Sequence, residues 1–282
     1  SQAFVLTCVF FCLSFLAHSS DLSETRKAAQ KGQAAAQFNL GNMYRNGLGV
    51  SQDYEQAIKW YWQAAKQGNQ DAQNNLGEMY DNGWGVSKDY EQALSLYRKS
   101  AQQGNADAQN NLGGMYQKGR RVPEDYEKAV KWFRQAAKQG NAKAQNNMGV
   151  MYDNGWGVSQ NYAQAIKWYR KAAQKSLALA QINLGLMYKN GLGVPQDYEQ
   201  AVKWYLQAAQ QGHAIAQKNL GNMYTRGEGA PQDYEKAVEW YRQAAQQGYA
   251  VAQNNLGLMY ENGHGAPQDY EKAVEWYRQA AQ

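Results

Sequence analysis

The feature that most constrains this chain is a 36-residue repetition that runs through residues 33–282 without insertion or deletion. Leucine or methionine recurs at one place in seven consecutive repeats, and a tyrosine follows four residues later in each. A strict period of this length predicts an array in which every repeat is one supersecondary element stacked on its neighbours. The repeats are 33–68, 69–104, 105–140, 141–176, 177–212, 213–248 and 249–282.

Each repeat has the pattern of two helices, which we call the A helix and the B helix. In the first repeat, Ala36, Leu40 and Tyr44 recur every four residues and form an apolar stripe on the A helix. We expect Gly47 to end this helix in a left-handed conformation and Asp53 to cap the start of the B helix. The predicted fold is therefore all-α, a superhelical solenoid of stacked antiparallel helix pairs with about 15 helices.

A glycine stands inside every A helix, at Gly41 and its six equivalents. Glycine inside a helix costs about 1 kcal/mol relative to alanine, so its recurrence predicts that another helix packs closely there. Of the 27 glycines, 26 fall at four repeated positions, and six of the nine tryptophans share one position. The tryptophans outside the pattern are Trp62, Trp84 and Trp156. We therefore expect specificity to lie in the few residues that break the pattern.

The N-terminal residues differ from the array. The run from Ala3 to Ala17 has fifteen residues without a charge, which is shorter than the roughly 20 apolar residues of a membrane-spanning helix. We interpret residues 1–20 as a signal peptide, truncated because it lacks an initiator methionine and a basic start, and an uncleaved anchor is the alternative. Both Cys8 and Cys12 lie in this segment, so the repeats hold no disulfide framework. Residues 21–32 match half a repeat and are expected to form an N-terminal capping helix.

The pattern A-x-x-x-L-G-x-x-Y-x-x-G-x-G-V, followed by D-x-x-x-A-x-x-W-Y-x-x-A-A-x-x-G, resembles the Sel1-like repeat family seven times over residues 33–282. These repeats are relatives of the tetratricopeptide repeats. The resemblance implies a right-handed α-solenoid whose concave groove binds proteins or peptides, and bacterial members are often exported to the periplasm or beyond the cell. Some cysteine-rich members are assigned β-lactamase activity, a branch that these cysteine-free repeats do not support.

If the A helices line the groove, the residues opposite the leucine stripe form the binding surface. These residues are polar or acidic in the second and third repeats, as at Asp71, Glu78 and Asp107, and become apolar in the fifth to seventh repeats. An exposed apolar stripe would be a partner site, and packing against the neighbouring repeat is the alternative. The candidate groove residues are Leu179, Ile182, Leu186, Ile215, Val251 and Leu258.

A row of asparagines runs along the flank of the A helices, although asparagine is a poor helix-interior residue. Its amides could bind the backbone of an extended peptide, or they could form hydrogen bonds between repeats. The row comprises Asn39, Asn75, Asn111, Asn147, Asn183, Asn219 and Asn255.

Four loop residues are further candidates for partner contact. Arg121 replaces the second loop glycine of the third repeat and follows Arg120, which indicates either an anion-binding loop or a tolerated variant. Trp84 and Trp156 occupy the variable place between the two loop glycines. Each is either an anchor for a partner or an indole folded over the next helix.

Residues that commonly take part in catalysis or metal binding are scarce. His213 and His264 stand at unlike repeat positions, and no zinc, serine-hydrolase or nucleotide motif occurs. A net charge of +5 and the leader disfavour nucleic-acid binding. We expect a non-catalytic, exported scaffold for a protein or peptide, without cofactor, metal or stable membrane insertion after leader cleavage. A hydrolase and an RNA-binding solenoid are the alternatives. We expect a monomer, and because the last repeat keeps Trp276 and Tyr277, the array could continue or associate end to end.

Overall fold

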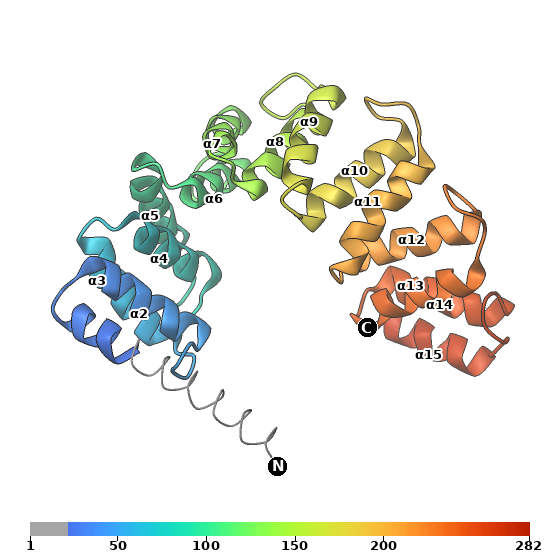
Figure 1. Ribbon diagram of the computed structural model, residues 1–282, viewed down its shortest axis with the longest axis horizontal. Coiled ribbons are helices and arrows are strands. Elements are labelled where there is room, and N and C mark those ends of the chain that lie inside the picture. The colour runs from blue at the N-terminus through green and yellow to red at the C-terminus, as the bar shows by residue number, and fades with distance from the viewer. Residues whose placement is uncertain (1–21) are drawn as a thin grey trace, which may run out of the picture. The chain divides into compact units, whose positions relative to one another are not determined.

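The computed structural model describes residues 22–282, and every regular element in this range is a helix (Figure 1). The leader predicted at residues 1–20 lies outside the described residues. Residues 22–30 are helical, within the segment expected to form a capping helix, and helices α2 to α15 follow. The predicted all-α array of helix pairs is confirmed.

The chain divides into two compact units, Ser1–Gln139 and Gly140–Gln282. The first unit contains α2 (Ala34–Asn46), α3 (Tyr54–Lys66), α4 (Gln70–Asn82), α5 (Tyr90–Gln102), α6 (Ala106–Gln117) and α7 (Tyr126–Lys138). The second unit contains α8 (Ala142–Asn154), α9 (Tyr162–Ala173), α10 (Ala178–Asn190), α11 (Tyr198–Gln210), α12 (Ala214–Arg226), α13 (Tyr234–Gln246), α14 (Ala250–Asn262) and α15 (Tyr270–Ala280). Even-numbered helices are the A helices, and odd-numbered helices from α3 onward are the B helices.

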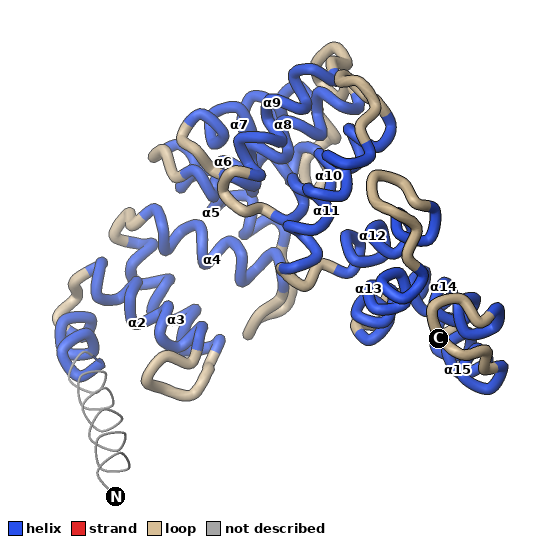
Figure 2. Tube along the Cα trace, turned by 45° about the vertical axis from the view of Figure 1, so that its right-hand side comes forward, coloured by secondary structure: helices blue, strands red, loops and turns tan. Residues whose placement is uncertain are grey.

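Within each unit, every helix packs on the next one along the chain, and loops join them in sequence (Figure 2). Helices α2 to α15 have only 11 to 13 residues. Isolated helices of this length are marginal in water, so packing of their apolar faces stabilises them. Stability therefore comes from stacking, as the repeat pattern predicts.

The helix ends follow the predicted signals. Gly47 has a φ of 70°, and its backbone N–H donates to the carbonyl of Met43 at the end of α2. The Asp53 carboxylate accepts a hydrogen bond from the backbone N–H of Gln56 at the start of α3. Both features use residue types suited to these positions, glycine for left-handed backbone and aspartate for the free N–H groups.

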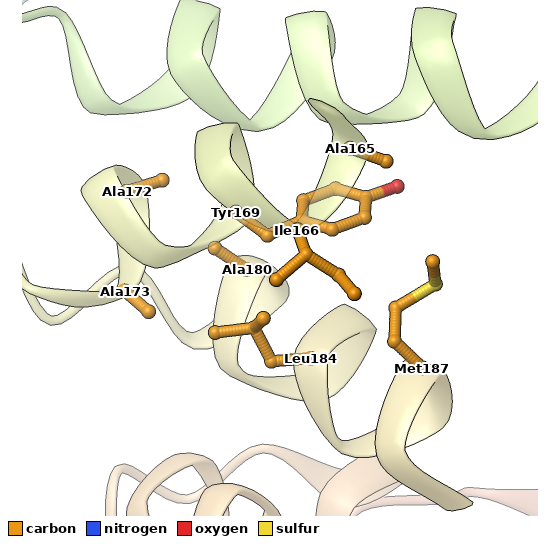
Figure 3. Close-up of a cluster of buried hydrophobic side chains, with 8 residues drawn as sticks. All are labelled: Ala165, Ile166, Tyr169, Ala172, Ala173, Ala180, Leu184 and Met187. Carbon is orange, nitrogen blue, oxygen red and sulfur yellow. The ribbon is translucent and has the colours of Figure 1, made fainter. Parts of the chain in front are cut away.

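Within each unit, the core consists of small and apolar side chains where a B helix meets the next A helix. Figure 3 shows one such cluster, in which Tyr169 and Ile166 of α9 meet Leu184 and Met187 of α10. Tyr169 is 1% exposed and Leu184 is 0% exposed. Fully burying side chains of this size contributes about 1.5–3 kcal/mol each, which makes these clusters the main source of cohesion.

The glycine inside each A helix lies against an aromatic ring of the paired B helix. A Cβ atom added at Gly41 would lie 2.6 Å from Cδ1 of Tyr61, and one added at Gly149 would lie 2.4 Å from Cδ1 of Tyr169. Real Cβ atoms do not approach ring carbons this closely, so the ring requires glycine beneath it. The close approach predicted from the helix-interior glycines is confirmed.

Candidate functional site

The candidate site is the surface of the A helices opposite the leucine stripe, which we call the A-face. It comprises positions 35, 38, 42 and 45 of the first repeat and their equivalents every 36 residues. Because Leu40 is 0% exposed in the core, the opposite side of the same helix is left for solvent or a partner. The A-face is described separately for each unit below.

Within both units, buried glutamines join neighbouring repeats. The Gln73 side chain donates from Nε2 to the carbonyl of Ala65 over 3.2 Å and accepts from Nε2 of Gln103 over 2.7 Å. Gln217 makes the matching bonds to Ala209 and Gln247 in the second unit. The carbonyls of Ala65 and Ala209 lie at the ends of the preceding B helices and also accept the backbone N–H groups of Gly68 and Gly212, so the glutamine is a second donor to each. The glutamine row is therefore a structural joint.

The asparagine row lies beside the A-face and makes hydrogen bonds between A helices. Asn75 Nδ2 donates to Oδ1 of Asn42 over 3.1 Å, and Asn255 Nδ2 donates to Oδ1 of Asn222 over 3.2 Å. Asn111 and Asn183 donate in the same way to Asn74 and Asn146. Asn219 accepts from Nζ of Lys218, Asn147 is half-buried, and Asn39 is exposed. The amides thus hold neighbouring A helices side by side at the edge of the A-face.

The A-face of the first unit is polar and crosslinked by ion pairs. Arg45 of α2 pairs with Glu78 of α4 at 2.8 Å, and Asp81 pairs with Arg120 at 2.9 Å. Burial, followed by the nearby Asp81 and Glu78 carboxylates, raises the pKa of Tyr97 below this surface. These charges neutralise each other, which leaves a hydrated surface with little apolar area.

The A-face of the second unit is apolar. Five of the six apolar residues proposed from the sequence are exposed on three A helices, α10, α12 and α14. Their exposed fractions are Leu179 49%, Leu186 43%, Ile215 36%, Val251 48% and Leu258 48%. Monomeric proteins rarely gather apolar side chains of this kind without a binding role.

Ile182 differs from the other candidates and corrects the sequence-based expectation of exposure. It is only 8% exposed and packs with Ala216 and Leu220 of α12 and with Tyr205 of α11. A residue at this position points toward the neighbouring A helix, so it belongs to the junction between repeats and is not available to a partner.

Charged groups border this apolar surface. Lys189 of α10 lies 3.5 Å from Glu228, and burial, followed by the nearby Lys189, lowers the pKa of Lys218. Tyr169 donates its hydroxyl hydrogen to Asp153 over 3.3 Å. Burial raises the pKa of the Asp153 carboxyl, an effect that the bond from Tyr169 partly opposes.

The loop candidates differ in exposure and in the contacts that they already make within the fold. The Trp84 indole stacks on the Tyr54 ring of the preceding repeat, with centroids 6.0 Å apart and an interplanar angle of 15°. Trp156 is 36% exposed. Arg120 lies over the Tyr90 ring and forms an ion pair with Asp81, so its charge is neutralised within the fold.

Arg121 is exposed and adopts a left-handed backbone with a φ of 56° at a place where most repeats have glycine. It lines a cavity of about 620 Å³ together with Glu91, Arg98 and Lys99. A carboxylate and three cations thus line this cavity between α5 and the loop of Arg121, which differs from a purely cationic anion site.

Within residues 22–282, no group of three or more His, Cys, Asp and Glu side chains is arranged to hold a metal ion. None of the helices in this described range has both the length and the apolar character needed to cross a membrane. In the second unit, the A-face presents exposed apolar side chains flanked by amides and charged groups.

Comparison with known families identifies the class. A model of the Sel1 repeat matches seven consecutive segments of the chain, residues 34–69, 70–105, 106–141, 142–177, 178–213, 214–249 and 250–282. The chain belongs to the Sel1 repeat family, whose members are generally scaffolds for protein interaction.

Solved structures agree with this assignment. A protective antigen of uropathogenic Escherichia coli strains is 40% identical, with a TM-score of 0.78 over 92% of this chain. This chain covers 56% of the length of that structure. A Sel1 repeat protein from Oxalobacter formigenes is 38% identical, with a TM-score of 0.74, and the match covers 93% of this chain and 77% of that one. An immunity protein from Pseudomonas aeruginosa, 22% identical with a TM-score of 0.53 over 76% of this chain and 81% of that one, shares the fold alone. No curated protein sequence matches the chain.

Proposed function

We propose that this chain is an exported, non-catalytic scaffold that binds a protein or peptide on the A-face of its second unit. The observation that carries the proposal is the set of five exposed apolar side chains at two repeat positions of three A helices. Burying such side chains against a partner would gain about 25 cal/mol for each Å² of apolar area removed from water.

The arrangement favours a partner segment that presents apolar side chains at regular intervals. Leu179 and Leu186 are seven residues apart on α10, which is about 10 Å along a helix. Val251 and Leu258 repeat this spacing on α14. The asparagine row would lie beside the bound segment, and its main role would be to hold the A helices in place.

The location outside the cytoplasm rests on two supports. The sequence has an uncharged apolar run from Ala3 to Ala17 that is typical of an export leader. The E. coli structure with 40% identity is a protective antigen. We therefore place the function in the periplasm or at the cell exterior, with the chain acting as a monomer.

A matched pair of double variants tests the binding surface. Leu186→Glu with Leu258→Glu puts charge on the A-face, whereas Leu48→Glu with Val274→Glu changes residues of similar exposure, 53% and 44%, that lie on no A helix. The immobilised chain is used to capture partners from envelope and host extracts, mass spectrometry identifies them, and their affinities are then measured. We expect the A-face variant to bind at least about tenfold more weakly.

Both double variants should keep the free energy of unfolding within about 0.5 kcal/mol for each substitution, because the side chains are exposed. Equal capture by the two variants would show that the A-face assignment is wrong. Hydrolysis of a β-lactam by metal-free protein would instead favour the hydrolase alternative, and RNA affinity that falls steeply with salt would favour the RNA-binding alternative.

A further inference from the structure

A second surface of the molecule departs from the repeat pattern at two neighbouring points. It lies in the first unit and involves the B helices, so it does not depend on the proposed function of the A-face. Six repeats have tryptophan at the position of Trp60, and only the second repeat has a different residue there, Leu96. This tryptophan covers the core of the preceding junction in other repeats: Trp132 packs on the cluster of α5 and α6, and Trp204 on that of α9 and α10.

In the second repeat, Leu96 covers the corresponding cluster of α3 and α4. A leucine side chain is smaller than an indole, so part of this cluster loses its cover. The structure shows the result as a cavity of about 470 Å³ lined by residues of α3, α4 and α5. The volume lies within the range of roughly 300–1,000 Å³ typical of small-molecule sites.

The second departure is Trp62, which also lines this cavity. The equivalent position holds arginine in five repeats, and Arg170 there donates to the hydroxyl of Tyr188 over 2.6 Å. Trp62 removes that guanidinium beside Tyr80, which lines the cavity as well. The indole is 48% exposed, an unusual state for so large an apolar ring.

The lining combines an apolar floor with cations at the rim. Leu76 is 1% exposed and forms part of the floor with Leu96. Lys66 Nζ lies 3.7 Å from the centroid of the Trp62 ring, and Lys99 is the other lysine among the lining residues. The lining residues include two lysines and no carboxylate, so the lining itself carries a net positive charge.

We propose that this cavity, the Trp62–Leu96 pocket, binds a small aromatic carboxylate. The ring of the ligand would pack on Leu76 and Leu96 and stack against the Trp62 indole, where flat apolar rings gain most contact. Its carboxylate would face Lys66 and Lys99, which supply the opposite charge. Apolar surface provides most of the affinity, and the two lysines select an anion over a neutral ring.

The probe is 2-naphthoate, titrated into the full chain by calorimetry, with 2-naphthalenemethanol as the neutral analogue. We expect saturable binding of naphthoate and about fivefold weaker binding of the alcohol. Leu96→Trp restores the residue that six repeats carry and fills the cavity, so it should weaken naphthoate binding at least about tenfold. Trp62→Leu, the residue found at the equivalent Leu206, removes the stacking ring without adding a charge and should weaken binding in the same direction.

The charge is tested with two matched double variants. Lys66→Gln with Lys99→Gln should reduce naphthoate binding to that of the alcohol. Lys138→Gln with Lys171→Gln makes the same changes two repeats later, outside this lining, and should leave the affinity unchanged. Circular dichroism during heating checks that each variant is folded.

Three outcomes would overturn the proposal: no saturable binding of naphthoate, equal binding by folded Leu96→Trp and the unaltered chain, or equal loss in both lysine double variants. The first would exclude the ligand class, and the other two would place the bound probe elsewhere. None of these outcomes bears on capture of a protein by the A-face.

Discussion

The A-faces of the two units share one backbone plan and differ in surface chemistry. In the first unit, Arg45 and Glu78 cross between A helices as an ion pair. In the second unit, Leu186 takes the place of Glu78, and Leu179 and Leu258 also reach solvent. The difference shows that these repeats separate the residues that build the fold from the residues that face outward.

The buried side of the two units is nearly the same. Tyr97 in the first unit and Tyr205 in the second are each 1% exposed, and each ring lies on the glycine of the paired A helix. Surface positions can therefore change from ion pairs to leucines while the packing beneath them stays constant. Three predictions test this separation.

The largest expected effect concerns the shared core. Tyr97→Ala and Tyr205→Ala should each lower the free energy of unfolding by about 3–5 kcal/mol, because each leaves a cavity against a glycine. Urea titration followed by circular dichroism at helix wavelengths gives both values. A clear inequality between them would show that the two cores are not equivalent.

The second prediction exchanges the surface residues at one repeat position. Glu78→Leu should cost about 1 kcal/mol, because it removes the partner of the half-buried Arg45. Leu186→Glu should change the stability by less than about 0.5 kcal/mol, because the leucine is exposed. The same urea titration measures both, and equal costs would contradict the contrast between the two A-faces.

The smallest effect concerns two aspartates at one repeat position. Burial raises the pKa of Asp153, so its charged form is less favourable in the folded state, and the folded state gains stability as pH falls through that raised pKa. Asp153→Asn should remove this pH dependence and raise stability at neutral pH by a few tenths of a kcal/mol. Asp81→Asn, which weakens the pair with Arg120, should lower stability instead by about 0.2–1 kcal/mol.

Thermal melts of both variants between weakly acidic and neutral pH separate the two cases. A loss of stability at neutral pH in Asp153→Asn would mean that the bond from Tyr169 outweighs burial at this carboxylate.

Much of the fold could be predicted because one period controls it. The recurrence of Leu40, Gly41 and Gly47 determines the two helices, their close contact and the turn between them. The exposure of Leu186 could also be read from its angle on the helix. Ile182 could not, because a helical wheel gives the direction of a side chain and not the distance to the neighbouring helix.

The Trp62–Leu96 pocket lay beyond sequence reasoning for a related reason. Trp62 is visible in the sequence as a tryptophan outside the pattern, but Leu96 is an ordinary apolar residue. The two residues belong to different repeats, and only the packing of α3, α4 and α5 brings them to one cavity. A cavity that results from a smaller side chain cannot be recognised from the residue type alone.

The glutamine joint has a consequence for how such a chain can change over generations. Gln73 and Gln217 each donate to a carbonyl of the preceding B helix and accept from a glutamine at the end of the B helix of their own repeat, so one repeat offers its neighbours the same connectors as another. Duplication, loss or reordering of repeats that carry these glutamine bonds would keep neighbouring repeats joined while changing the order of acidic and apolar A-faces. Recombination between repeats can thus produce new binding surfaces while the packing between neighbouring repeats stays the same.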